Sequence, residues 1–178
     1  LLKNKRFWFA ASTHRGEEVL CLKVHLDIKK KYNEILTIIA PRHVDRVNEI
    51  KRLCDKFSLK AQILNNDEHI QNNKEIIIIN SFGVLNQFFR YAKSTFIGKS
   101  TIEKLKSVGG QNPIDAAKLG CKIYHGPFVY NFEEIYEILN QNGISKKIGS
   151  AAELSDNLLI DLKENVKKKP EISSFVSS

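Results

Sequence analysis

Two segments of the sequence combine residue types that bind a phosphate or a carboxylate. Pro41-Arg42 places a guanidinium beside a rigid imino acid, and its planar fork of N–H donors matches either anion. Asn112-Pro113-Ile114-Asp115 follows a double glycine, and Asn and Pro favour the start of a helix, whose free N–H groups attract anions. We expect Asp115, a turn inside that helix, to accept hydrogen bonds from sugar hydroxyls. A surface arginine and simple helix capping are the alternative interpretations.

Three further segments follow apolar runs. Phe82-Gly83 and Gly98-Lys99-Ser100 each carry a glycine at a predicted strand end. In the third segment, Ser12 or Thr13 is expected to cap the coming helix, with Glu17 and Glu18 in its first turn. GxGxxG and GxxxxGK[ST] are both absent from the sequence, which argues against a dinucleotide site and a P-loop ATPase. The order of residues does not assemble a Ser-His-Asp or Cys-His triad either.

Apolar runs that alternate with amphipathic stretches define the elements that must position these segments. The isoleucine run at 76–79 is β-branched, which is typical of a strand, whereas the apolar residues of 44–57 recur at helical spacing. Strands are expected at 6–11, 35–40, 61–64, 75–79, 94–97, 121–125 and 143–148, and helices at 16–31, 44–57, 84–92, 112–119, 131–140 and 151–168. This alternation predicts one α/β domain with a doubly wound parallel sheet. Ligands of such sheets bind at the carboxyl ends of the strands.

Composition narrows the class of protein. The 178 residues include 28 Lys+Arg and 20 Asp+Glu, which gives a net charge of +8. The sequence has no run that is apolar and long enough for a membrane span or a signal peptide, so neither is expected. Three widely spaced cysteines predict buried thiols in a reducing cytoplasm, without zinc or a disulfide. The lysine runs predict solvated faces, with attraction to nucleic acid or an acidic lipid surface as the alternative.

A series of short motifs runs along nearly the whole chain. They are Ser12-Thr13-His14, Gly16-Glu17-Glu18, Pro41-Arg42-His43, Gly83, Phe96-Ile97-Gly98, Ser100, Gly109-Gly110, Asn112-Pro113, Gly126-Pro127 and Asn131-Phe132. Their order and spacing resemble the C-terminal half of the 3-deoxy-D-manno-octulosonic acid (Kdo) transferases. The resemblance implies a single Rossmann-like domain at 1–169, of the C-terminal type found in GT-B glycosyltransferases, and a flexible tail at 170–178. Enzymes of this family transfer Kdo from CMP-Kdo to a lipid A precursor in lipopolysaccharide biosynthesis, and their C-terminal domain holds the CMP-sugar.

The resemblance also implies a set of donor contacts. Contacts to CMP fall at 41–42, 82–84 and 112–115, with Gly98 and Ser100 lining the same cleft. The full set is Pro41, Arg42, Phe82, Gly83, Val84, Gly98, Ser100, Asn112, Pro113, Ile114 and Asp115. No metal is expected, and no cofactor beyond the donor substrate. No catalytic residue is assigned, because the general-base glutamate of the family lies in the N-terminal acceptor domain.

The sequence departs from the family pattern at several of these positions. The family has Met-Gly-Glu where this sequence has Phe82-Gly83-Val84. It has a glutamate at the position of Asp115 and a histidine at the position of Gln111. The N-terminal domain has no counterpart here and the sequence has no methionine, so we expect a truncated or split homologue that is inactive alone. Two alternatives stay open, namely a non-catalytic nucleotide-binding remnant and half of a GT-B enzyme that uses a UDP-sugar.

The resemblance implies partners as well. They are the CMP-sugar donor, the lipid A precursor, a separate chain that supplies the N-terminal domain, and the anionic surface of the inner membrane. The expected location is the cytoplasm or the cytoplasmic face of that membrane. Nucleic acid is not expected, because the aromatic residues fall inside apolar runs rather than among exposed basic residues.

Overall fold

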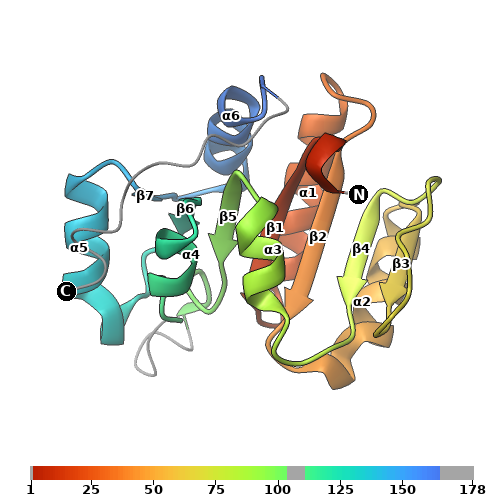
Figure 1. Ribbon diagram of the computed structural model, residues 1–178, viewed down its shortest axis with the longest axis horizontal. Coiled ribbons are helices and arrows are strands. Elements are labelled where there is room, and N and C mark those ends of the chain that lie inside the picture. Colours follow the sequence, from red (N-terminus) through yellow and green to blue (C-terminus); the bar gives the residue numbers. More distant parts are fainter. Residues whose placement is uncertain (1, 104–110, 165–178) are drawn as a thin grey trace.

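Seven strands form one sheet in the computed structural model, which describes residues 2–103 and 111–164 (Figure 1). The strands are β1 (Phe7–Thr13), β2 (Leu36–Pro41), β3 (Ala61–Leu64), β4 (Ile76–Ile79), β5 (Ser94–Ile97), β6 (Lys122–His125) and β7 (Ser145–Lys147). Their spatial order is β3-β4-β2-β1-β5-β6-β7, and every neighbouring pair is parallel. The glycine pair at 109–110 and the tail at 170–178, both named in the sequence-based predictions, lie outside the described residues.

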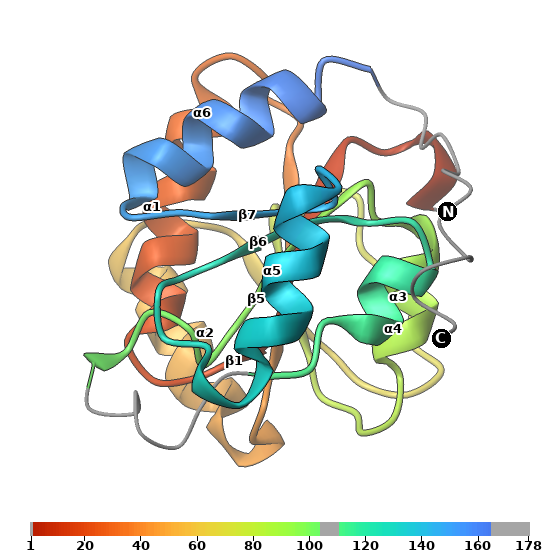
Figure 2. The same cartoon turned by 90° about the vertical axis from the view of Figure 1, so that its left-hand side faces the viewer.

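Helices cover both faces of the sheet (Figure 2). One face carries α1 (Glu17–Lys29), α2 (Val47–Lys56) and α6 (Ala151–Asp161). The other face carries α3 (Leu85–Tyr91), α4 (Ile114–Lys118) and α5 (Glu133–Gln141). Short 3-10 turns are η1 (Leu2–Asn4), η2 (Val44–Arg46) and η4 (Tyr130–Phe132). Trp8 of β1 belongs to the first core and its neighbour Phe9 to the second, as the two-residue period of a strand requires. Burial on both faces explains the unbroken apolar runs and confirms the doubly wound class.

The strand order reverses beside β1. β2 lies on one side of β1 and β5 on the other, and the chain reaches β5 only after passing through β3 and β4. The carboxyl ends of β1 and β5 therefore form the switch point at which doubly wound sheets bind their ligands. β1 ends there in a bulge, since its register with β2 shifts between Ala11 and Thr13, and Ser12 takes a left-handed φ of 58°.

The last helix is shorter than predicted. It ends at Asp161 rather than near 168, and Leu162–Glu164 already lie outside it. The Nε of Arg6 donates to the carbonyl of Leu162 at 2.8 Å, and the Asp161 carboxylate accepts hydrogen bonds from Ser94 and Tyr124 of the sheet. These contacts fix the end of α6 against the strands. Their partners are distant in sequence, so the local sequence does not reveal where the helix ends.

The starts of α1 and α4 also differ from the predictions. Ser12 and Thr13 belong to β1 and do not cap α1, whose N-cap is Gly16 in a left-handed conformation with φ 101°. α4 begins at Ile114, two residues later than predicted, and the Oδ1 of Asn112 accepts a hydrogen bond from the Ile114 amide at 2.9 Å. Asn112 thus still satisfies one donor of the helix start.

The three cysteines, Cys21, Cys54 and Cys121, are buried thiols, as predicted. Burial raises the pKa of the Cys54 thiol to about 12, so this group is inert as a nucleophile near neutral pH. Over residues 2–103 and 111–164, no helix combines the length and apolar character that crossing a bilayer requires.

Candidate functional site

The predicted contact residues gather at one edge of the sheet, formed by the carboxyl ends of the strands. Pro41 is the last residue of β2, residues 82–84 follow β4, and Gly98 and Ser100 follow β5. Residues 112–115 open α4, which begins at the same edge because it connects β5 to β6. The parallel sheet thus brings segments that are distant in sequence to one side of the molecule.

Arg42 presents a free cationic head at this edge. Its amide donates to the carbonyl of Thr13 at 3.0 Å, and the preceding Pro41 is buried in register with Thr13. The guanidinium is exposed, and within the described residues it forms no hydrogen bond or ion pair. A fixed backbone with an unpaired guanidinium is suited to recognising an anion.

The loop after β4 presents an aromatic ring to solvent. Phe82 is 74% exposed, and Gly83 adopts a left-handed φ of 71°. Val84 is half-buried and immediately precedes α3. A large ring that is this exposed offers a flat face for stacking.

The segment 112–115 offers one exposed acceptor. Pro113 is buried and Ile114 is half-buried, whereas Asn112 and Asp115 are exposed. Since the Ile114 amide is already bonded to Asn112, fewer free amides remain at this helix start than the sequence predicts. The Asp115 carboxylate is exposed.

Gly98 and Ser100 are both buried, and their contacts hold the backbone of the loop after β5. A Cβ at Gly98 would lie 2.3 Å from the carbonyl oxygen of Ser12. The Ser100 hydroxyl donates to the carbonyl of Ile97 at 2.6 Å and accepts from the amide of Gly126 at 2.9 Å. These contacts give both residues a structural function, which is to fix the loop after β5 against the ends of β1 and β6. The expectation that they line a cleft stays a prediction.

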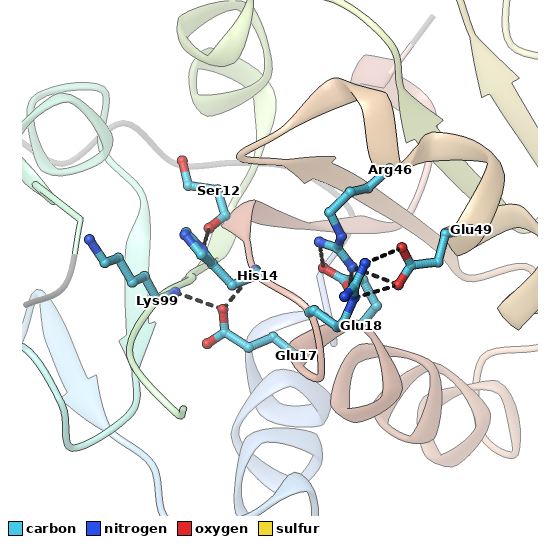
Figure 3. Close-up of polar contacts among 8 residues, drawn as sticks. Ser12, His14, Glu17, Glu18, Arg46, Glu49 and Lys99 are labelled. Atoms are coloured by element: carbon cyan, nitrogen blue, oxygen red, sulfur yellow. Dashed lines mark hydrogen bonds and ion pairs between the residues drawn. The ribbon is translucent and has the colours of Figure 1, made fainter. Parts of the chain in front are cut away.

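Glu17 is the central polar residue of the switch point, and the predicted contact set omits it (Figure 3). Its carboxylate is fully buried and accepts from the amides of His14 at 3.0 Å and Lys99 at 2.6 Å. It also accepts from the amides of Ser100 and Thr101 and from the Thr101 hydroxyl. The spacing of residues offered one clue to the burial of Glu17. It lies four residues before Cys21, which is buried, and thus on the buried face of α1.

A chain of ion pairs extends from the neighbouring Glu18. Glu18 is buried and accepts from Arg46 at 2.6 Å, and Arg46 also approaches Glu49 at 3.5 Å. Two hydrogen bonds from Arg15 hold the pKa of Glu49 below its usual value. These pairs join the start of α1 to α2 and leave both Glu18 oxygens occupied, so Glu18 serves the scaffold.

His14 lies above Glu17 at the end of β1. Its Nδ1 is 3.1 Å from the carbonyl of Ser12, and its ring meets that of His43 edge-on with centroids 5.9 Å apart. Because a carbonyl oxygen only accepts, Nδ1 carries the proton and Nε2 is free to accept a hydrogen bond. Burial is the main cause that lowers the pKa of His14, so the ring is neutral at pH 7.

A pocket of about 410 Å³ borders this edge on the side of β7. Its described lining includes Gly16, Thr101, Phe128 and Ser150, and none of the predicted contact residues. Among the described residues, no group of three or more His, Cys, Asp and Glu side chains is placed to hold a metal ion. The expectation that no metal takes part remains a prediction.

Fold and geometry together define a Rossmann-like α/β domain whose candidate site lies at the β1–β5 switch point. Solved structures support this class. The chain aligns with the C-terminal CMP-Kdo binding domain of WaaA from Acinetobacter baumannii with a TM-score of 0.75, at 20% identity, over 94% of this chain and 92% of that one. The molybdenum cofactor carrier protein of Chlamydomonas reinhardtii aligns with a TM-score of 0.50 at 10% identity, over 90% and 99% of the two chains. At these identities the likeness concerns the fold.

Sequence comparison relates the chain to one group of enzymes. It is 29% identical over 137 residues to the 3-deoxy-D-manno-octulosonic acid transferase of Haemophilus influenzae, 25% identical over 163 residues to that of Aquifex aeolicus, and 28% identical over 164 residues to that of Rickettsia prowazekii. The matches cover 77%, 90% and 92% of this chain but only 31%, 44% and 34% of the relatives. No protein-family model matches the chain.

The resemblance inferred from the motifs is thereby confirmed. Over most of its length the chain is similar to the C-terminal part of Kdo transferases, and it spans less than half the length of the curated relatives that it matches.

Proposed function

We propose that this chain is the donor-binding part of a Kdo transferase and that it binds CMP-Kdo at the carboxyl edge of its sheet. The observation that carries the proposal is the similarity to curated Kdo transferases over 77% to 92% of the chain. The fold supports it, because the structural relative with the TM-score of 0.75 is described as a CMP-Kdo binding domain.

The exposed groups of the edge suit the parts of CMP. In the proposal, the Arg42 guanidinium pairs with the phosphate through charge-assisted hydrogen bonds. The Asp115 carboxylate accepts hydrogen bonds from ribose hydroxyls, and the ring of Phe82 stacks on the base. Phe82 would then provide by stacking what a methionine provides by contact in the family pattern. Pro41, Gly83, Val84, Asn112, Pro113 and Ile114 complete the proposed contact set.

The activity of the whole protein belongs to the same proposal. Direct displacement at the anomeric carbon of Kdo would use a hydroxyl of the lipid A precursor as the nucleophile, deprotonated by a glutamate of the acceptor domain. Arg42 would stabilise the departing CMP phosphate. The proposed location is the cytoplasmic face of the inner membrane, where the net charge of +8 favours contact with anionic lipid.

Titration of the chain with CMP tests the proposal. We expect saturable binding in calorimetry that weakens roughly 10-fold to 100-fold in Arg42→Ala, because a charge-assisted contact to phosphate is lost. Arg52→Ala is the matched control, since Arg52 is also an exposed arginine but lies on α2. We expect CMP affinity to change less than about 2-fold in that control.

UDP in the same titration separates the alternative donor. UDP should compete poorly with CMP if the chain serves a CMP-sugar. Stronger binding of UDP would favour half of an enzyme that uses a UDP-sugar. A chain that binds neither nucleotide, or an Arg42→Ala variant that binds CMP as well as the parent, would contradict the proposal.

A further inference from the structure

Lys99 is a second unpaired cation at the switch point. It follows β5 directly, with φ 55°, and its amide is held by the buried Glu17 carboxylate at 2.6 Å. Its ammonium group forms no ion pair within residues 2–103 and 111–164. A half-buried lysine in a left-handed conformation is uncommon, because only glycine adopts that conformation without cost. Its side chain is thus presented from a fixed backbone.

The side chains of Ser12, His14 and Lys99 lie on one side of the Glu17 carboxylate (Figure 3). Ser12 and His14 come from the end of β1 and Lys99 from the end of β5, which are adjacent strands. Lys99 lies near enough to His14 to contribute, after burial, to the lowered pKa of that ring. The Glu17 carboxylate, which accepts from the Lys99 amide, is buried and saturated with donors, so it offers no exposed partner to the ammonium group.

The chemistry of the proposed donor places a second anion beside the phosphate. Kdo is an ulosonic acid, so its carboxylate and the oxygen that links it to phosphate are attached to the same anomeric carbon. A group that binds this carboxylate must therefore lie next to the group that binds the phosphate. Arg42 follows β2 and Lys99 follows β5, and these two strands flank β1. The two cations thus border the end of one strand.

We propose that Lys99 pairs with the carboxylate of the sugar acid, that the Ser12 hydroxyl donates to the same carboxylate, and that Nε2 of His14 accepts from a sugar hydroxyl. This inference rests on the proposed function and extends it, since it assigns the sugar to residues other than those assigned to CMP. It makes Lys99 a determinant of specificity for acidic sugars over neutral ones.

Binding of two ligands to the full chain of 178 residues tests the assignment. Freshly prepared CMP-Kdo and CMP are titrated into the parent chain and into Lys99→Asn, because asparagine tolerates the left-handed conformation better than most residues. The expected result is a loss of about 10-fold or more in affinity for CMP-Kdo and less than about 2-fold for CMP. Lys147→Asn is the control, since Lys147 is an exposed lysine at the carboxyl end of edge strand β7. It should bind both ligands like the parent.

The outcomes separate the two claims. Equal losses of affinity for CMP and CMP-Kdo in Lys99→Asn would assign Lys99 to the nucleotide and overturn the sugar assignment. Unchanged affinity for both ligands would overturn it as well. An equal loss in Lys147→Asn would attribute the effect to net charge and overturn the assignment too. If the parent chain binds CMP-Kdo no more tightly than CMP, only this inference is overturned. If it binds neither ligand, the proposed function is overturned as well. Thermal unfolding midpoints confirm that each variant is folded.

Discussion

At the scale of single residues, the glycines and serine of the loops act through the backbone. Gly98 lets β5 approach the bulge at Ser12, and Gly126 does the same for the loop after β6, where a Cβ would lie 2.1 Å from the Ser100 carbonyl oxygen. Ser100 bridges the two loops with its hydroxyl. Residues from three short family motifs thus form one packed junction that shapes this edge of the sheet.

Gly98→Ala tests this junction. We expect a loss of about 2 kcal/mol in the free energy of unfolding, because the new methyl group would collide with backbone rather than with a movable side chain. Urea denaturation measures the change. Gly149→Ala is the control, since its Cβ would meet only the flexible Glu153 carboxylate at 3.4 Å. Equal stability of the two variants would contradict the packing argument.

At the scale of elements, a buried network joins the middle of α1 to the opposite end of the sheet. Nδ1 of His25 lies 2.7 Å from the Thr37 hydroxyl of β2, and Nε2 lies 3.0 Å from Glu75, which precedes β4. Glu75 also accepts from Lys29 at 2.7 Å and from the amide of Lys60 at 3.1 Å. Burial alone would raise the pKa of Glu75, but these hydrogen bonds outweigh it and lower the pKa to about 2.

This network predicts a loss of stability in acid. The carboxyl group of Glu75 binds a proton near pH 4.5 in the unfolded chain but only near pH 2 in the folded one, so its contribution is present above pH 4.5 and lost as the pH falls toward 2. His25, whose pKa is lowered by burial, acts in the same direction below pH 6.5. Urea denaturation should show Glu75→Gln to be less stable than the parent by about 2 kcal/mol at pH 6, with the difference shrinking toward pH 2. The exposed Glu134→Gln should show no such convergence, and a constant difference for Glu75→Gln would contradict the assignment.

Most elements could be predicted from the sequence, and most of the switch point could not. β3 and β5 match their predicted ranges, because β-branched and apolar runs bounded by polar residues are local signals. The end of α6 and the burial of Ser100 depend on partners far away in sequence, such as Arg6 and Gly126. Contacts of this kind leave no periodic pattern in the sequence. Arg42 was predicted because it belongs to a local motif, Pro41-Arg42. The convergence of His14 with Lys99 was not predicted, because these residues are far apart in the sequence.

At the scale of the whole molecule, Glu17 connects the two wings of the sheet. One wing contains β1, β2, β4 and β3, and the other contains β5, β6 and β7. Helix α1 follows β1, yet its first carboxylate binds three successive amides of the loop after β5, at 99–101. The wings are therefore held together at the carboxyl edge of the sheet by this side chain in addition to the β1–β5 ladder.

Glu17→Gln should weaken this connection. An amide side chain has one acceptor oxygen, so several of the loop amides lose their partner inside the protein, and we expect a loss of about 3 kcal/mol in the free energy of unfolding. Glu137→Gln on the exposed side of α5 should change it by less than about 0.5 kcal/mol. A Glu17→Gln variant as stable as this control would show that the carboxylate is dispensable.

The single tryptophan of the sequence, Trp8, is fully buried in β1, the strand where the two wings meet. Its indole emission is consequently a built-in optical probe of the centre of the molecule, free of background from other indoles. Opening of the sheet should shift that emission to the red as water reaches the ring. Denaturation can therefore be followed by fluorescence without attaching a dye.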